Sequence, residues 1–196
     1  MANEYGTRAI LKSTLGIEAD DTTRDARIDR ALTAAARSID KTCGRRFWLD
    51  DTPVLRTYRT QDRIVCDDDG ELLLVDDIGS VAGMVVETGS GSSFTAVTDY
   101  ETSPDNAAAD GVAITGLRRV NGTWGTGRVR ITTKFGWPTV PADIVEASYI
   151  QASRLFKRAD SPEGILGSAE WGVVRLSRRD PDVWALIEPY ILPGFA

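Results

Sequence analysis

The chain has no histidine among its 196 residues and only two cysteines. Histidine is the commonest general base and metal ligand, so its absence removes every Ser-His or Cys-His nucleophile pair and every zinc site that needs a histidine. No Gly-x-x-x-x-Gly-Lys-Ser/Thr phosphate loop occurs either. Cys43 and Cys66 are too few for a disulfide framework, and we expect two free thiols. These absences predict a protein that is not an enzyme and holds no catalytic residue, metal or cofactor.

Long apolar runs are also missing, because no stretch approaches the 18 apolar residues of a transmembrane helix. The first residues lack the basic start and apolar core of a signal peptide, which predicts a cytoplasmic protein with no membrane partner. Hydrophobic residues make up 42% and charged residues 27% of the chain. These are ordinary globular values, so we expect one well-cored domain, or one domain that carries an insertion.

The net charge of −6 is concentrated in the middle of the chain. Residues 51–149 carry fifteen acidic and eight basic side chains, whereas the segments on either side are nearly balanced. Proteins that bind duplex DNA normally have a basic face, because neutralised phosphates supply most of their affinity. The acidity either serves solubility alone or forms a surface past which DNA slides without binding.

Apolar periodicity predicts two long helices and two short ones. A short helix over residues 7–15 ends at Gly16. A long helix begins at Thr22, with Asp25 three residues on in a capping-box arrangement, and ends at Gly44. Its apolar stripe consists of Ile28, Leu32, Ala35, Ile39 and Cys43.

A second long helix begins near Pro141, followed after a loop by a short C-terminal helix. The apolar stripe of this second long helix consists of Val145, Tyr149, Ala152 and Phe156, while Ile144 and Ile150 lie on other sides of the helix. The apolar surface is therefore broader than one partner helix requires. The loop after it has a candidate strand at residues 173–176, and the C-terminal helix runs from its cap Asp180 to Pro189.

Short β-rich runs alternate with turn residues between these helices. They cover residues 55–60, 71–75, 81–87, 94–97, 116–120 and 129–135, and Asn121-Gly122 is a hairpin signal between the last two. The predicted fold class is α+β, with a small helical core of two long helices and a short C-terminal helix. Residues 1–50 and 135–196 form this core, and residues 51–134 form an inserted antiparallel β-rich lobe that we expect to be separable.

Two charged motifs have both a structural and a functional interpretation. Asp67-Asp68-Asp69-Gly70-Glu71 has oxygens suited to calcium or magnesium, but its glycine comes too early for an EF-hand loop, which favours an acidic hairpin turn. The arginine pairs Arg45-Arg46 and Arg178-Arg179 lie at helix boundaries. They are either solvated cations near helix ends or partners in salt bridges with a neighbouring subunit.

The C-terminal segment, residues 181–196, has apolar side chains on nearly every side, although the helix within it is only about two turns long. The apolar side chains are Val183, Trp184, Leu186, Ile187, Tyr190, Ile191, Leu192 and Phe195. One interpretation packs this segment on its own long helix. The other, which we favour, places it outside the subunit's own core as a docking segment whose aromatic residues enter pockets on a partner.

Three segments resemble the head–tail connector, or adaptor, proteins of tailed bacteriophages. They are Ile39-Asp40-Lys41-Thr42-Cys43-Gly44-Arg45-Arg46-Phe47, then Phe135-Gly136-Trp137-Pro138-Thr139-Val140-Pro141 with the helix that ends at Arg158, and finally the stretch from Asp160 to Val183. The resemblance covers most of the chain outside residues 51–134. The smallest members of the family are almost wholly helical, so the lobe departs from that pattern.

The resemblance implies a structural siphophage protein, made in the host cytoplasm and located in the virion neck, at the head–tail interface. Its subunits would form a ring, usually a dodecamer, beneath the portal protein. The ring would contact the next neck or tail protein, and genomic DNA would pass through its channel without specific binding. The candidate residues for binding the portal or a neighbouring subunit are Trp184, Ile187, Tyr190, Ile191, Phe195, Arg178, Arg179, Arg45 and Arg46.

Two alternatives remain open at this point. The chain is another neck protein, a stopper or tail terminator, although those resemble β-barrels without this helical frame. Otherwise the β-rich lobe is a host- or carbohydrate-binding module in which Trp124 and Trp137 stack on sugars, although tryptophan in a strand more often belongs to the core.

Overall fold

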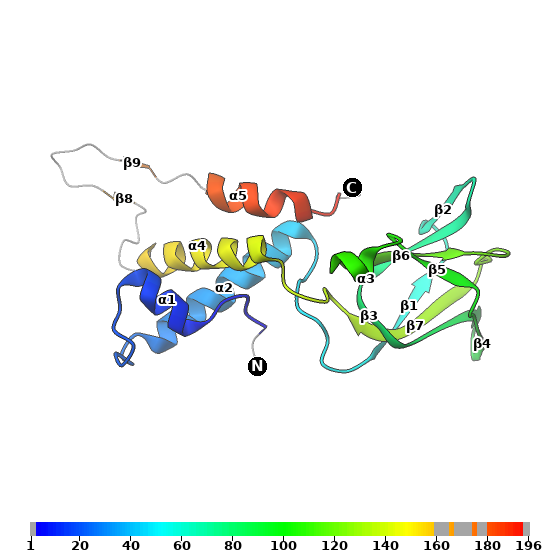
Figure 1. Ribbon diagram of the computed structural model, residues 1–196, viewed down its shortest axis with the longest axis horizontal. Coiled ribbons are helices and arrows are strands. Elements are labelled where there is room, and N and C mark those ends of the chain that lie inside the picture. The colour runs from blue at the N-terminus through cyan, green and yellow to red at the C-terminus, as the bar shows by residue number, and fades with distance from the viewer. Residues whose placement is uncertain (1–2, 159–164, 167–173, 176–179, 194–196) are drawn as a thin grey trace. The chain divides into compact units, whose positions relative to one another are not determined.

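A computed structural model describes residues 3–158, 165–166, 174–175 and 180–193. The chain divides into two compact units, which we call the helical unit (residues 1–46 and 140–196) and the β unit (residues 47–139). Each unit has its own buried core. The predicted α+β class is confirmed (Figure 1). In the described part of the chain, no helix combines the length and apolarity needed to cross a membrane.

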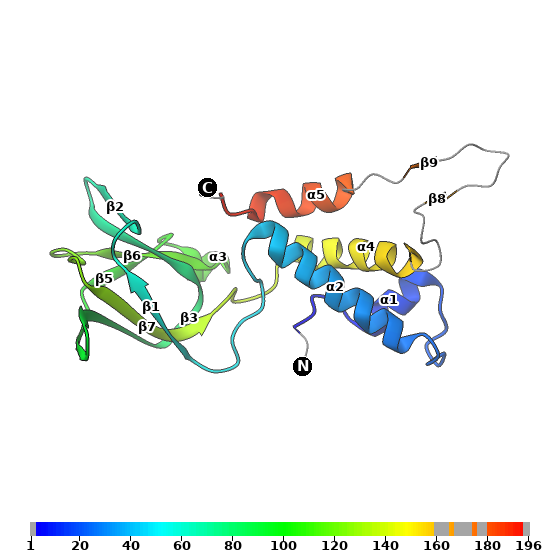
Figure 2. The same cartoon turned by 180° about the vertical axis from the view of Figure 1, so that it is seen from behind.

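The helical unit is built on two long helices that pack against each other, α2 and α4. The short helix α1 contacts both, and α5 packs on α4, as the two opposite views show (Figures 1 and 2). The elements are α1 (Arg8–Leu15), α2 (Asp25–Cys43), α4 (Ala142–Arg158), the small hairpin of β8 (Ile165–Leu166) and β9 (Val174–Arg175), α5 (Pro181–Ile187) and the 3-10 turn η1 (Glu188–Tyr190).

Helix ends follow the capping chemistry of the sequence, with one exception. Gly16 and Gly44 end α1 and α2 in the left-handed conformation that glycine adopts without strain. The predicted start of α2 at Thr22 is wrong, because the helix begins at Asp25. The Asp21 carboxylate accepts the N–H of Thr23 and holds this stretch in a turn before the helix. The predicted stripe of α2 is buried at all five positions.

Helix α4 buries a wider face than its predicted stripe. Ile144, which the periodicity places off the stripe, is fully buried, whereas Val145 is only partly so. The reason is that α4 is covered by α2 and α1 and also by α5. The broad apolar surface of this helix is therefore used, at least in part, inside the subunit.

The β unit is one antiparallel sheet with strand order β1-β7-β3-β6-β5. Its long central strand β3 pairs with β2 and β6 along its first part and with β7 and β4 along its second. Register shifts in β3 lie between these parts, and such irregularities bend a strand. The strands are β1 (Val54–Arg59), β2 (Ile64–Asp67), β3 (Gly70–Ser90), β4 (Ser93–Ala96), β5 (Tyr100–Ser103), β6 (Ile114–Arg119) and β7 (Arg128–Phe135), with the short helix α3 (Ala107–Asp110) between β5 and β6.

The sheet differs from the sequence prediction in three ways. The predicted runs 71–75 and 81–87 are parts of the single strand β3, and the short strands β2 and β5 were not predicted. The Asn121-Gly122 hairpin is wrong, because β6 and β7 lie on opposite sides of β3. The connection between them is anchored by the buried Trp124, whose indole N–H donates to the carbonyl oxygens of Glu71 and Leu117.

Candidate assembly surface

The C-terminal helix α5 is fixed at its start by charged and polar contacts. The Asp180 carboxylate accepts the backbone N–H groups of Asp182 and Val183, at 3.0 and 3.3 Å. Its other oxygen lies 2.9 Å from a guanidinium nitrogen of Arg154 on α4. A capped first turn and an ion pair to a long helix compensate for the shortness of α5, which would not be stable by itself.

The inner side of α5 belongs to the core of the helical unit. Val183 is 8% exposed and Ile187 only 3%. The Cys43 thiol donates to the Ile187 carbonyl, and the Leu192 N–H donates to the Cys43 carbonyl at 2.9 Å. The expectation that this segment lies outside the subunit's own core is therefore wrong for the inner side of α5. Ile187, predicted to bind a partner, is buried because the helix turns this side chain toward its own chain.

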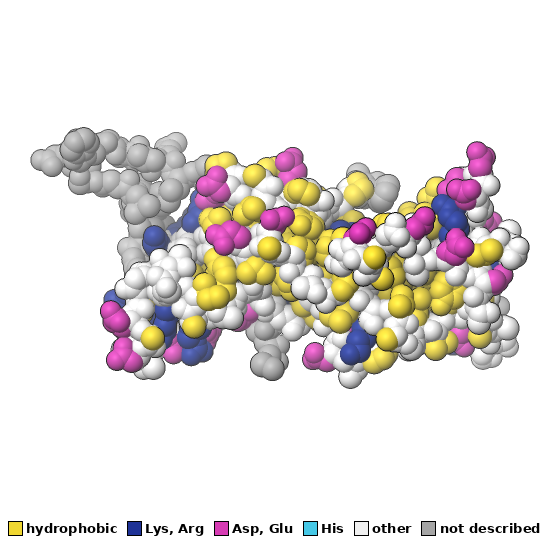
Figure 3. Space-filling view, in the orientation of Figure 1, with side chains coloured by type: hydrophobic (Ala, Val, Ile, Leu, Met, Phe, Trp, Pro, Cys, Tyr) yellow, Lys and Arg dark blue, Asp and Glu magenta, His cyan; other side chains and the backbone are white. Residues whose placement is uncertain are grey.

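The outer side of α5 and the following residues carry the predicted aromatic candidates. Trp184, Tyr190 and Ile191 are half-buried, and Leu192 is 41% exposed. Hydrophobic side chains lie among acidic ones on the surface that α5 forms (Figure 3). Trp184 also borders a cavity of about 120 Å³, whose other lining residues are Ser38, Ile39, Thr42, Gln151, Asp180, Val183 and Ile187.

Tyr190 is oriented by a contact with α4. Its hydroxyl donates to an Asp143 carboxylate oxygen at 3.1 Å. Partial burial, together with this carboxylate, raises the pKa of the Tyr190 phenol. The hydrogen bond to Asp143 fixes the orientation of the Tyr190 ring.

The arginine pair Arg45-Arg46 directly follows the end of α2, and both side chains are half-buried. The Leu192 N–H donates a hydrogen bond to the Cys43 carbonyl in the last turn of α2. The arginine pair and the C-terminal segment therefore lie at the same end of that helix. Burial raises the pKa of the Asp40 carboxyl in this last turn, against the opposing effects of the Tyr5 hydroxyl, Arg37 and Arg46. The remaining candidates, Phe195, Arg178 and Arg179, lie outside the described residues.

The acidic loop at residues 67–71 forms the tight turn between β2 and β3, with Asp67 opposite Gly70 in the register. The Asp67 carboxylate accepts the Asp69 N–H at 3.0 Å and binds the Arg118 guanidinium through two oxygens. The hydrogen bond from Arg118 lowers the pKa of this carboxyl. The hairpin-turn interpretation is confirmed, and the described residues contain no cluster of acidic or cysteine side chains suited to a metal.

Both tryptophans proposed for sugar stacking are buried in the β unit. Trp124 is 3% exposed and Trp137 is 7% exposed. The Trp137 indole donates to the Asp77 carboxylate at 3.2 Å, and its ring centroid lies 5.4 Å from that of Phe47. Sugar binding by stacking on these two rings is therefore wrong, because neither ring face is accessible.

A buried lysine in the helical unit was not predicted from the sequence. Lys12 is 5% exposed, and its ammonium donates to the carbonyl oxygens of Ala19 and Asp21 and lies 2.6 Å from the Asp25 carboxylate. The hydrogen bond from Lys12 is the main cause that lowers the Asp25 pKa, and Arg8 adds to it from 2.8 Å. A cleft of about 740 Å³ borders these residues. The cations here are paired within the chain, so the network holds the loop between α1 and α2.

The fold and its surfaces define a class: a two-unit α+β protein, one helical and one antiparallel, with a partly apolar C-terminal surface. Among solved structures the chain is similar to one in the neck of an empty gene transfer agent (GTA) particle computed with C6 symmetry. The identity is 18% and the TM-score 0.57, covering 96% of this chain and 90% of that one. A chain in the virion of the native GTA particle is similar at 19% identity and a TM-score of 0.54, with the same coverage.

No family model matches the sequence, and no curated protein matches it. At these identities the likeness to the two GTA chains is one of fold. Because it covers 96% of the chain, the similarity extends over the helical unit and the β unit together.

Proposed function

We propose that the chain is a non-enzymatic structural subunit of the neck of a tailed-phage-type particle. In this role it is an adaptor that forms a ring beneath the portal and extends the DNA channel toward the tail. The observation that carries the proposal is the fold likeness to a neck chain over 96% of this sequence. The three segments that resemble adaptor proteins support the same role independently.

A ring also agrees with the symmetry of the similar particle. Identical subunits that contact one another head to tail close into rings when the rotation permits. The neck that contains the similar chain was computed with C6 symmetry. Such symmetry is compatible with rings of six or twelve copies, including the dodecamer that the adaptor resemblance implies.

The outer side of α5 is our candidate for the surface that meets the portal. Trp184, Tyr190 and Ile191 supply partly buried apolar area, and Arg45-Arg46 supply charge at the same end of α2. Aromatic and arginine side chains dominate binding energy at protein interfaces. The net charge of −6 supports a channel through which DNA passes without specific binding, since a duplex-binding protein would need a basic face.

Deleting the gene from a particle-producing genome tests this function. Loss of an adaptor should leave filled or leaking heads without tails, together with free tails, and a plasmid copy should restore joined particles. An epitope-tagged copy should be labelled by gold at the head–tail junction. Normally joined particles from the deletion strain, or a label at another place in the particle, would overturn the proposal.

A further inference from the structure

One side of the β unit carries a row of three residues, assembled by the strand register, in which two exposed aliphatic side chains flank a threonine. In β1, β7 and β3, Leu55 lies opposite Thr132, and Thr132 lies opposite Val85. Leu55 is 52% exposed and Val85 46%. Their neighbours Ile131 and Val86 are buried, so the alternation of a strand places this row on the outward face of the sheet.

Arginines lie on the same face of β1 and β7, four residues along the strand from Leu55 and Thr132, while β3 has Gly89 at this position. Arg59 is opposite Arg128 in the register, and both are exposed. Between the two rows, Arg130 lies opposite Glu87 in the register, and its guanidinium carbon is 3.6 Å from the centroid of the Phe94 ring. Neither Arg59 nor Arg128 has an ion-pair partner within the described residues. We call Leu55, Val85, Arg59, Arg128 and Arg130 the basic face.

The basic face is unexpected because it lies in the acidic unit of the chain. The β unit carries fourteen acidic and eight basic side chains, whereas the helical unit carries fifteen of each. Like charges directly opposite each other also destabilise an antiparallel pair of strands. An acidic partner that neutralises Arg59 and Arg128 would remove this repulsion.

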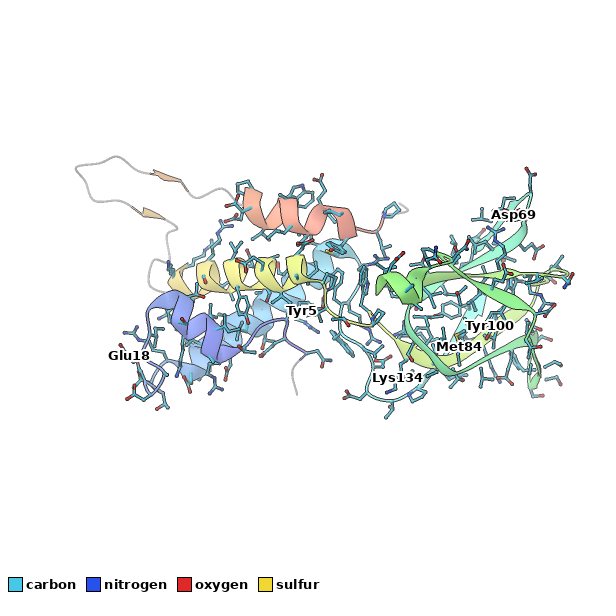
Figure 4. All side chains as sticks on the ribbon, in the orientation of Figure 1. Tyr5, Glu18, Asp69, Met84, Tyr100 and Lys134 are labelled. Carbon is cyan, nitrogen blue, oxygen red and sulfur yellow. The ribbon has the colours of Figure 1, made fainter. Side chains whose placement is uncertain are left out.

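A surface of complementary chemistry projects from the other part of β3. The hairpin of β2 and β3, residues 64–73, has Asp68 and Asp69 exposed at its tip, where acidic side chains gather (Figures 3 and 4). Behind the tip, Val65 is 46% exposed. Asp67 is bound to Arg118 of the same subunit, so the two aspartates at the tip are the ones available to a partner. We call this element the acidic hairpin.

We propose that the basic face of one copy binds the acidic hairpin of the next copy. The two surfaces match in kind, because each combines exposed aliphatic side chains with charge, and the charges are opposite. The basic face spans β1, β7 and the second part of β3, whereas the acidic hairpin joins β2 to the first part of β3. The contact therefore joins unlike patches of two copies. Such a heterologous contact closes a ring when the rotation between copies permits it. DNA is the less suitable occupant, since phosphates would not cover Leu55 and Val85.

Charge-swapped variants of the full chain test this contact by sedimentation velocity, in low salt and in 0.5 M NaCl. Arg59→Glu/Arg128→Glu and Asp68→Lys/Asp69→Lys should each weaken self-association by about tenfold or more, because like charges then face each other. An equimolar mixture should restore it, because each variant complements the other. Asp51→Lys/Asp110→Lys makes the same charge change as Asp68→Lys/Asp69→Lys, on exposed residues elsewhere in the β unit, and should leave self-association unchanged.

The wild type should self-associate less in high salt, since screening weakens exposed charge pairs. The proposal is overturned by a wild type that stays monomeric in low salt at millimolar concentration. It is equally overturned if both charge variants associate normally or if their mixture fails to recover. The inference rests on the proposed neck function only for the biological meaning of the ring. Sedimentation tests the contact alone, while the deletion strain tests the function, so either is able to fail without the other.

Discussion

Replacing Ile187 by alanine tests whether α5 is part of the helical core. The side chain is 3% exposed, and the substitution removes three buried carbon atoms. Transfer free energy of about 0.8 kcal/mol for each methylene gives roughly 2.4 kcal/mol, and the cavity left behind raises the loss to about 3 kcal/mol. For a chain of this length each kcal/mol lowers the Tm by roughly 2–4 °C. We therefore expect the Tm of the chain to fall by about 6–12 °C.

Trp184→Ala is the matched variant on the same helix, three residues away. Trp184 is half-buried and already borders a cavity, so its loss costs the core less than the loss of Ile187. If the outer side of α5 meets the portal, removing this aromatic anchor costs about 2 kcal/mol or more of binding free energy. Portal affinity should then fall more than about tenfold, with a smaller decrease in Tm than Ile187→Ala causes.

Calorimetry measures the melting transition of each variant. Portal binding is then compared at a temperature at which both variants are folded. The core argument fails if Ile187→Ala leaves the Tm unchanged. The docking argument fails if Trp184→Ala lowers the Tm as much as Ile187→Ala while the folded protein still binds the portal at wild-type affinity.

Three further outcomes are expected. Lys12→Met should lower the free energy of unfolding by about 3 kcal/mol in urea titrations, because two carbonyls and the Asp25 carboxylate lose a charged donor; an unchanged midpoint contradicts this. Replacing residues 51–134 by a Gly/Ser linker should leave a soluble helical protein with a cooperative melt, whereas an aggregated product would show that the strands supply the main core. Arg118 lowers the Asp67 pKa from 3.8, so this pair stabilises the native state above that value and loses its effect as the pH falls through the lowered one. Arg118→Gln should therefore lower the urea midpoint at pH 7 and have progressively less effect on acidification; a difference that persists unchanged at acid pH contradicts the assignment.

The long helices could be predicted from the sequence because their signals are long and redundant. Five apolar positions in α2 agree on one face, and Gly44 ends the helix where it is expected. The strands β2 and β5 have only four residues each, and neither Ile-Val-Cys-Asp nor Tyr-Glu-Thr-Ser alternates between apolar and polar residues. The Asn121-Gly122 signal failed because a hairpin also needs its two strands to be neighbours. The anchoring of Trp124 by Glu71 depends on contacts between residues far apart in the chain.

The candidate surfaces could be predicted only in part. Residues 181–187 are apolar on nearly every side, so periodicity cannot tell Ile187, which faces the core, from Trp184, which is partly accessible. The basic face has no sequence signal at all. Arg59 and Arg128 are far apart in the chain, and only the pairing of β1 with β7 places them side by side.

The two proposed contacts use different units of the same subunit, each with its own core. The portal candidate Trp184 lies in the neutral helical unit, while Arg59 and Asp68 lie in the β unit, which carries the whole net charge. Contacts of different chemistry respond differently to solution conditions. Salt weakens exposed charge pairs but leaves apolar burial largely intact. Under these two proposals, ring closure would be sensitive to ionic strength, whereas attachment to the portal would depend on apolar packing.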